Sequence, residues 1–147
     1  MYLEIDNISK SYGTGDSRVV VLKGISCGIE KVDICVLLGP SGSGKSTLLN
    51  IVGGIDTPDS GSVTIGRDCL EEFNANQLTQ YRRKHLGFIF QSYNLIPNLT
   101  VKENIEVGAY LSDKPLPVDE LIDLLGLEEH KDKRPNQLSG GQQQRTS

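Results

Sequence analysis

Residues 39–47 read GPSGSGKST, and this stretch decides how the rest of the chain is interpreted. It fits the pattern G-x-x-x-x-G-K-[ST], with Gly39, Gly44, Lys45 and Ser46 in the fixed places. Glycines let the backbone curl so that successive N–H groups point at phosphate oxygens, and a helix that follows offers its free N–H groups to the same anion. The stretch therefore predicts a phosphate-binding loop. Its remaining candidate contacts are Ser41, Gly42, Ser43 and Thr47.

The residues on either side supply the context that such a loop needs. Residues 34–38, Ile-Cys-Val-Leu-Leu, are apolar at every position, which predicts a strand buried on both faces of a parallel sheet. Residues 45–52 predict a helix that Gly53 and Gly54 close. The alternative, a Gly/Ser-rich turn without a ligand, is less consistent with this context. Lys45 is expected to reach the β- and γ-phosphates and Ser46 to coordinate Mg²⁺.

The remaining segments alternate between strand and helix patterns. Leu3, Ile5 and Ile8 lie on or near one face of an expected strand, and Thr100 with Glu103 has the spacing of a capping box, so a helix is expected to begin there. Further strands are expected at 19–29, 62–65 and 86–90, and further helices at 75–84 and 119–125.

Composition excludes several classes of protein. The chain has 147 residues and a net charge of −4, which argues against a general nucleic-acid binder. No apolar run approaches the roughly 20 residues that a membrane span requires. Cys27, Cys35 and Cys69 form neither a metal-binding pair nor a disulfide framework and are interpreted as reduced thiols. His85 and His130 are isolated and are assigned no role in metal binding or catalysis.

The last residues, 136–147, read NQLSGGQQQRTS. Ser139 is a good helix N-cap, and Gly140 and Gly141 expose backbone N–H groups beside it. A helix start of this kind predicts a second anion site. A flexible Gly/Gln tail is the alternative that this segment alone leaves open.

Taken together, GPSGSGKST and LSGGQQQR resemble the nucleotide-binding subunits of ABC transporters. The resemblance covers essentially the whole chain and implies ATP and Mg²⁺ as cofactors. Residues 138–142, LSGGQ, resemble the family's signature motif, whose counterparts to Ser139, Gly140, Gly141 and Gln142 contact the γ-phosphate of ATP held by the opposite subunit. The resemblance therefore implies a homodimer, or a pair with another ATP-binding subunit, that encloses two ATP molecules.

Two further positions match the family residue by residue. Tyr12 stands where the family has an aromatic ring that stacks on adenine, although an ordinary tyrosine at a strand end is a competing interpretation. Gln91 matches the glutamine that bridges Mg²⁺ and the transmembrane partner. The resemblance thus implies Ser46 and Gln91 as the metal-binding residues.

Residues 87–104 narrow the match to the lipoprotein-release and macrolide-export subgroup, whose partners are FtsX-like permeases. Apolar and aromatic residues after Gln91 are expected to line a groove that receives a permease helix, and local core packing is compatible with that role. The resemblance implies a cytoplasmic location on the inner face of the membrane, held there through the permease, with no span of its own. The permease, and not this chain, would contact the transported substrate.

The sequence departs from the family at its last residues and at Val32. After Arg145 only Thr146 and Ser147 follow, so the catalytic glutamate and the switch histidine of the family have no counterpart. The chain is therefore expected to be truncated, to bind nucleotide with negligible hydrolysis, and to leave an apolar sheet edge bare beside residues 34–38. Val32 stands where the family tends to have a glycine, which suggests a tight turn.

The expected fold class is α/β: a P-loop NTPase core sheet with an N-terminal antiparallel β region and a helical subdomain, and with the C-terminal part missing. One incomplete nucleotide-binding domain is expected over 1–147, with the core at 1–91, the helical subdomain at 92–138 and the signature motif at 138–147. A non-catalytic ATP-binding or partner-binding module is the alternative function. A small kinase or GTPase is disfavoured, because the chain has no Asn-Lys-x-Asp motif.

Overall fold

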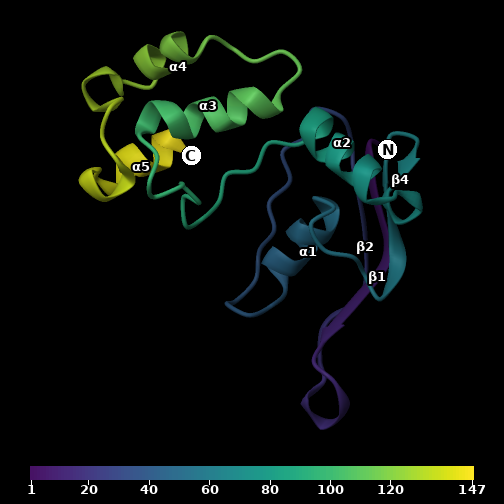
Figure 1. Ribbon diagram of the computed structural model, residues 1–147. Coiled ribbons are helices and arrows are strands. Elements are labelled where there is room, and N and C mark those ends of the chain that lie inside the picture. Colours follow the sequence, from purple (N-terminus) through teal and green to yellow (C-terminus); the bar gives the residue numbers. More distant parts are fainter. The chain divides into compact units, whose positions relative to one another are not determined.

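The computed structural model describes residues 1–147, which form two compact units, Met1–Arg82 and Arg83–Ser147 (Figure 1). Each unit is described by itself. The helices and strands of the first unit are β1 (Leu3–Tyr12), β2 (Val19–Ile29), α1 (Lys45–Val52), β3 (Ser60–Ile65), β4 (Asp68–Cys69) and α2 (Ala75–His85), whose last turn passes the boundary. Those of the second are α3 (Val101–Leu111), α4 (Val118–Leu124) and α5 (Gly140–Thr146).

The first unit is built on an antiparallel sheet with the strand order β2-β1-β3-β4. Leu3 of β1 pairs with Ile29 on one side and with Ile65 on the other. Alternation along the strands places Ile5 and Val63 in the core, because successive side chains of a strand point to opposite faces. The expected N-terminal antiparallel region is therefore present.

Helix α1 lies beside this sheet (Figure 1), with Leu48 and Ile51 buried. It spans the residues that the sequence predicted. Tyr81 of α2 is also buried, and its hydroxyl donates to the backbone oxygen of Val52 at 3.0 Å. Burial raises the pKa of Tyr81 to about 12, because desolvation penalises the phenolate. The hydrogen bond from Tyr81 to Val52 joins α2 to the end of α1.

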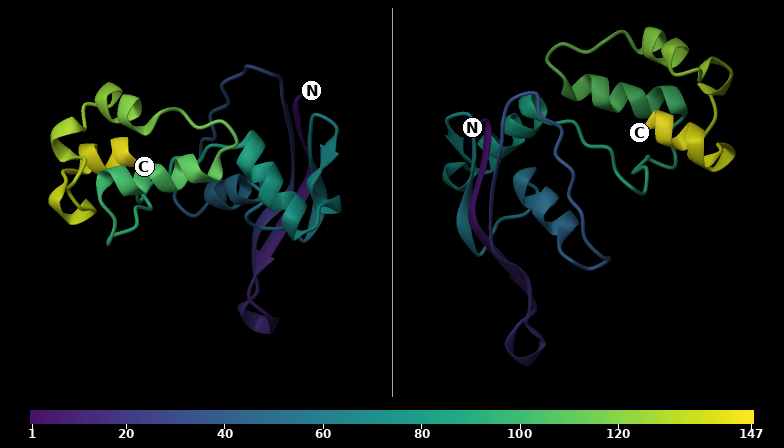
Figure 2. Two further views of the ribbon diagram at one scale, coloured as in Figure 1. Left: turned by 45° about the horizontal axis from the view of Figure 1, so that its top comes forward. Right: turned by 180° about the vertical axis from the view of Figure 1, so that it is seen from behind.

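The predicted strands at residues 34–38 and 86–90 are wrong. Both segments are extended coil in the structure (Figure 2). Ile34 and Leu38 are 94% and 87% exposed. A strand requires hydrogen-bonding neighbours, and the strands of the sheet pair only with one another, so neither segment has a partner strand within the 147 residues.

The second unit is a small helical assembly with its own core. Its buried members come from α3, α4 and the segments that follow α4: Val101, Ile122, Leu127 and Leu138. Thr100 and Glu103 form the predicted capping box at the start of α3, with the Glu103 carboxylate accepting from the Thr100 backbone N–H at 2.7 Å. Gly126, with φ 63°, follows the end of α4, as the sequence predicted for a left-handed helix stop.

A tight turn follows β2. The backbone N–H of Asp33 donates to the oxygen of Glu30 at 3.3 Å, and Val32 occupies the third position of the turn with φ 75°. That position favours glycine, because a β-branched side chain is strained in the left-handed region. The tight turn that the sequence suggested at Val32 is therefore present, and it is strained.

Replacing Val32 by glycine is expected to stabilise the chain by roughly 1 kcal/mol, because relief of the left-handed strain exceeds the added flexibility of the unfolded chain. Urea unfolding, followed by circular dichroism, measures the difference. Lys31→Gly is the matched control and is expected to destabilise, since Lys31 does not have a positive φ. An unchanged or lower stability of Val32→Gly would contradict this account of the turn.

None of the helices in the structure is both long enough and apolar enough to cross a membrane.

Candidate nucleotide-binding site

The expected site residues divide between the two units. Tyr12 and the loop of residues 39–47 belong to the first unit, whereas Gln91 and the signature residues 139–142 belong to the second. Within each unit the structure shows how the local sequence positions them.

The phosphate loop bends through two left-handed glycines, Gly42 with φ 78° and Gly44 with φ 88°. A side chain at Gly44 would also meet Leu22 Cδ2 at 2.8 Å and the backbone oxygen of Val21 at 3.1 Å. Gly44 is therefore required both by its backbone conformation and by the close approach of β2. The loop is exposed from Gly39 to Ser43, whereas Gly44 and Lys45 are partly buried.

The Lys45 side chain, near the end of the loop, folds back onto earlier loop residues. Its ammonium group donates to the backbone oxygens of Gly39 at 2.9 Å and Pro40 at 2.7 Å, and to the Ser43 hydroxyl at 3.4 Å. All three acceptors belong to the loop itself. A phosphate group bound in the loop would offer charged oxygens to the same ammonium group, and such charge-assisted bonds are stronger than those to neutral carbonyls.

Helix α1 begins directly at Lys45, and no side chain caps its N-terminus. The first turn of a helix has free N–H groups and the positive end of the helix dipole, which together favour an anion. Ser46 lies in this turn with its side chain exposed, and Thr47 is half-buried. The left-handed glycines, the uncapped helix start and the hydroxyl of Ser46 form a donor set that fits a Mg²⁺-bound phosphate group.

Tyr12 is the last residue of β1 and is 44% exposed. Its hydroxyl donates to Asp56 Oδ2 at 2.5 Å, and the ammonium group of Lys10 lies over its ring, 5.1 Å from the centroid. The hydrogen bond to Asp56 is the largest cause that raises the pKa of Tyr12. Burial acts to raise the pKa of Asp56, but hydrogen bonds from Lys10 and Tyr12 help to lower it overall. The ring is thus held at its polar end.

Sequence reasoning missed the part that Asp56 and Lys10 take in this arrangement. Asp56 lies 44 residues from Tyr12 along the chain, between the expected helix at 45–52 and the expected strand at 62–65. No local pattern links the two positions. The sequence offers only a weak signal. An acidic residue, Asp56, follows the predicted helix, and an expected strand has a lysine and a tyrosine two residues apart, Lys10 and Tyr12.

The signature residues begin α5 as the sequence predicted for Ser139. The Ser139 hydroxyl accepts from the Gln142 N–H at 3.3 Å, and the Gln142 side-chain oxygen accepts from the Ser139 N–H at 2.8 Å. The Gln142 amide nitrogen also lies 2.8 Å from His130 Nε2. Gly140 and Gly141 are exposed. The segment is therefore an ordered helix start in the structure and not a flexible tail.

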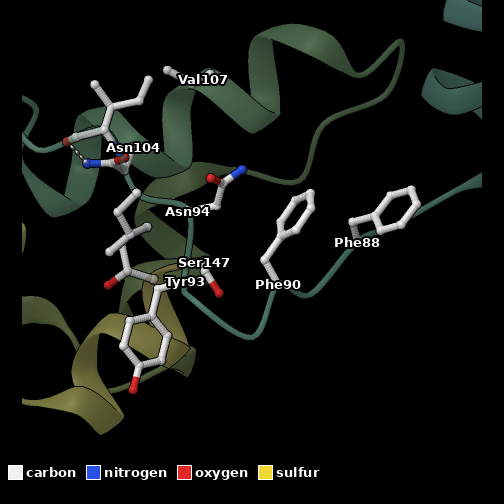
Figure 3. A pocket seen from close by; sticks show the side chains of 10 residues that line it. Phe88, Phe90, Tyr93, Asn94, Asn104, Val107 and Ser147 are labelled. Carbon is white, nitrogen blue, oxygen red and sulfur yellow. Dashed lines mark hydrogen bonds between the residues drawn. The ribbon is translucent and has the colours of Figure 1, made fainter. Parts of the chain in front are cut away.

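Gln91 is exposed and follows Phe88 and Phe90, whose rings stack with centroids 5.5 Å apart. A groove of about 150 Å³ lies beside them (Figure 3). The side-chain amide of Asn104, on α3, donates to the Ile96 backbone oxygen at 3.2 Å and holds this side of the groove in place. The residues that line the groove are Phe88, Phe90, Tyr93, Asn94, Leu95, Ile96, Asn104, Val107, Thr146 and Ser147.

Comparison with known proteins assigns this architecture to a family. The model of the family described as "ABC transporter" matches residues 22–147. The chain is also similar to a solved ATP-binding cassette, MJ0796, in a dimeric post-hydrolysis state bound to ADP and Pi. The TM-score is 0.87 at 37% sequence identity, and the match covers 98% of this chain and 66% of that one. This similarity confirms the α/β fold class that the sequence predicted.

Curated relatives agree with this assignment. A Mycoplasma pneumoniae protein described as an ABC transporter ATP-binding protein, the MG065 homolog, is 49% identical over 99% of the chain, which spans 32% of that relative. The bacitracin export ATP-binding protein BceA of Halalkalibacterium halodurans is 45% identical, also over 99% of the chain, which spans 59% of it. The chain thus spans about a third of the first relative and somewhat over half of the second. It belongs to the ABC transporter family.

Proposed function

We propose that this chain is the ATP-binding part of an ABC transporter of the export type, which couples ATP binding and hydrolysis to transport through a membrane permease. The observation that carries the proposal is the uncapped start of α1 behind a glycine loop, with the Lys45 ammonium group held by loop oxygens. This arrangement suits a triphosphate, because it joins backbone donors, a helix dipole and one cation.

In this proposal the loop residues 39–47 surround the phosphates. Lys45 exchanges its contacts with Gly39 and Pro40 for the β- and γ-phosphate oxygens. Ser46 and Gln91 would hold Mg²⁺, as the family resemblance implies, and the bound ion would neutralise phosphate charge. Tyr12 stacks on the adenine base, since its ring is accessible and its hydroxyl is bound by Asp56.

The signature segment serves a second nucleotide. Ser139, Gly140, Gly141 and Gln142 would contact the γ-phosphate of ATP bound to a paired subunit, in a homodimer or in a pair with another ATP-binding subunit. The dimeric state of the similar solved cassette supports this arrangement. The exposure of both glycines at an ordered helix start supports it too, since a partner's phosphate could reach their N–H groups.

The permease partner is proposed to dock beside Gln91. The groove there is open and lined by aromatic and aliphatic side chains together with amides (Figure 3). Such a surface suits an amphipathic helix of a membrane protein. The relative named for bacitracin export supports the export subgroup, and FtsX-like permeases are the proposed partners. The location that follows is the cytoplasmic face of the membrane.

The 147-residue chain itself is expected to bind ATP and to hydrolyse it negligibly. Phosphoryl transfer requires a residue that orients the attacking water, and the resemblance assigns that role to none of these residues. The test measures binding of ATP and phosphate release on the same preparation, with Lys45→Ala as the background. Saturable binding with equal phosphate release from both proteins is the expected result. Turnover that disappears in Lys45→Ala would refute the claim of negligible hydrolysis, and absence of binding would refute the proposed function.

A further inference from the structure

Asp56 joins two parts of the first unit through its side chain. Its Oδ1 accepts from the Lys10 ammonium group at 2.8 Å, and its Oδ2 accepts from the Tyr12 hydroxyl at 2.5 Å. The side chains of Lys10 and Asp56 are only 11% and 27% exposed. Lys10 also donates to the backbone oxygen of Thr57 at 2.6 Å. The carboxylate therefore fixes two neighbouring side chains of β1 at once.

Asp56 is in turn held by the helix that starts at the phosphate loop. The backbone N–H groups of Ile55 and Asp56 both donate to the oxygen of Asn50 in α1, at 2.9 and 3.2 Å. The N–H of Thr57 donates to Asp56 Oδ1 at 2.8 Å, which orients the carboxylate. A short chain of bonds thus runs from α1 through Asp56 to the Tyr12 hydroxyl.

These contacts also determine which face of the Tyr12 ring is available. The Lys10 ammonium group lies over the ring, and the hydroxyl is held by Asp56. A cation on one face of an aromatic ring is attracted by its negative face, and a flat base can then stack on the other. Since Tyr12 is 44% exposed, the ring still has surface to offer.

We propose that Asp56 is a positioning residue for the nucleotide base: it fixes the distance and the orientation of the Tyr12 ring relative to the phosphate loop without contacting the nucleotide. The inference rests on the proposed function, in which Tyr12 stacks on adenine. A single ATP molecule must fit its base and its phosphates at the same time. Holding the ring in place before binding reduces the entropy that is lost when the complex forms.

The test separates the base from the phosphates. Titration calorimetry compares ATP with inorganic tripolyphosphate, which has no base, on the unaltered chain and on Asp56→Asn. Asparagine keeps the shape but removes the charge. Its oxygen can face the Lys10 and Thr57 donors while its NH₂ group donates to the Tyr12 oxygen, so the charge-assisted bond from the Tyr12 hydroxyl is replaced by a weaker neutral one. The expected result is an increase of about tenfold in the Kd for ATP, the size of a weakened base stack, with the Kd for tripolyphosphate unchanged within about twofold.

Two further variants keep the test specific. Tyr12→Phe removes only the hydroxyl and is expected to weaken ATP binding at least as much as Asp56→Asn does. The double variant is expected to bind no more weakly than Tyr12→Phe alone, because both changes act on the bond between the Tyr12 hydroxyl and Asp56. Asp68→Asn removes an exposed carboxylate of the same unit and is expected to leave both affinities unchanged.

Three outcomes would overturn the inference. An unchanged ATP affinity in Asp56→Asn would show that the contact does not position the ring. An equal loss of ATP and tripolyphosphate affinity would show that Asp56 acts through the phosphate loop or the fold instead. Failure of the unaltered chain to bind ATP would overturn the proposed function, and the inference with it, which distinguishes this outcome from the first two.

Discussion

Replacing Lys45 by alanine is expected to weaken ATP binding by about a hundredfold. In the structure the Lys45 ammonium group has three acceptors, all within the loop: Gly39, Pro40 and Ser43. On binding, it would move to charged phosphate oxygens, and each hydrogen bond to a charged group is worth about 1.5–3 kcal/mol. Loss of one or two such bonds corresponds to roughly a hundredfold change in Kd. Titration calorimetry with ATP and Mg²⁺ measures it.

Lys31→Ala is the matched control for the loss of a positive charge. Lys31 is exposed in the turn after β2 and makes no contribution to the loop in this account. We expect its ATP affinity to equal that of the unaltered chain. Equal affinities of Lys45→Ala and Lys31→Ala would contradict the role given to Lys45.

Replacing Ile122 by alanine is expected to unfold the helical unit. Ile122 is fully buried in α4 among Val101, Leu127 and Leu138. Truncating a buried isoleucine to alanine costs about 2–5 kcal/mol, which approaches the whole net stability of a small unit. Hydrogen exchange of the amides in α3 and α5 is expected to lose its protection. The signature residues then lose the ordered helix start at Ser139.

Leu124→Ala provides the control within the same helix. Leu124 is 81% exposed, so its truncation removes little buried surface and is expected to leave hydrogen exchange in α3 and α5 unchanged. Full protection of these amides in Ile122→Ala would contradict the assignment of the core. An equal loss in both variants would show that α4 itself, and not burial of Ile122, determines stability.

Elements with local signals could be predicted from the sequence. The phosphate loop can be predicted because its left-handed backbone positions favour glycine. The structure has Gly42 and Gly44 in that conformation. The starts of α3 and α5 are set by Ser or Thr and a Glu or Gln three residues later, and both capping boxes form. Each of these signals lies within a few residues of its consequence.

Predictions of features that depend on residues far apart along the chain were wrong or were missed. Residues 34–38 have the apolar composition of a buried strand, yet Ile34 and Leu38 are exposed, because strand formation depends on neighbouring strands and not on composition. Asp56 escaped notice for the same reason, since its contacts with Lys10 and Tyr12 join residues more than 40 positions apart. In both cases the outcome depends on contacts between residues far apart along the chain, which no local sequence pattern indicates.

The central claim is that the chain holds ATP through the backbone of residues 39–47 and the ring of Tyr12. Mapping amide chemical shifts during a titration with ATP and Mg²⁺ tests it most directly, since every loop residue except Pro40 has an N–H that can report. The account predicts saturable shifts concentrated at Gly42, Gly44, Lys45 and Ser46, with a further shift at Tyr12. No saturable shift, or shifts that leave this loop unaffected, would contradict it.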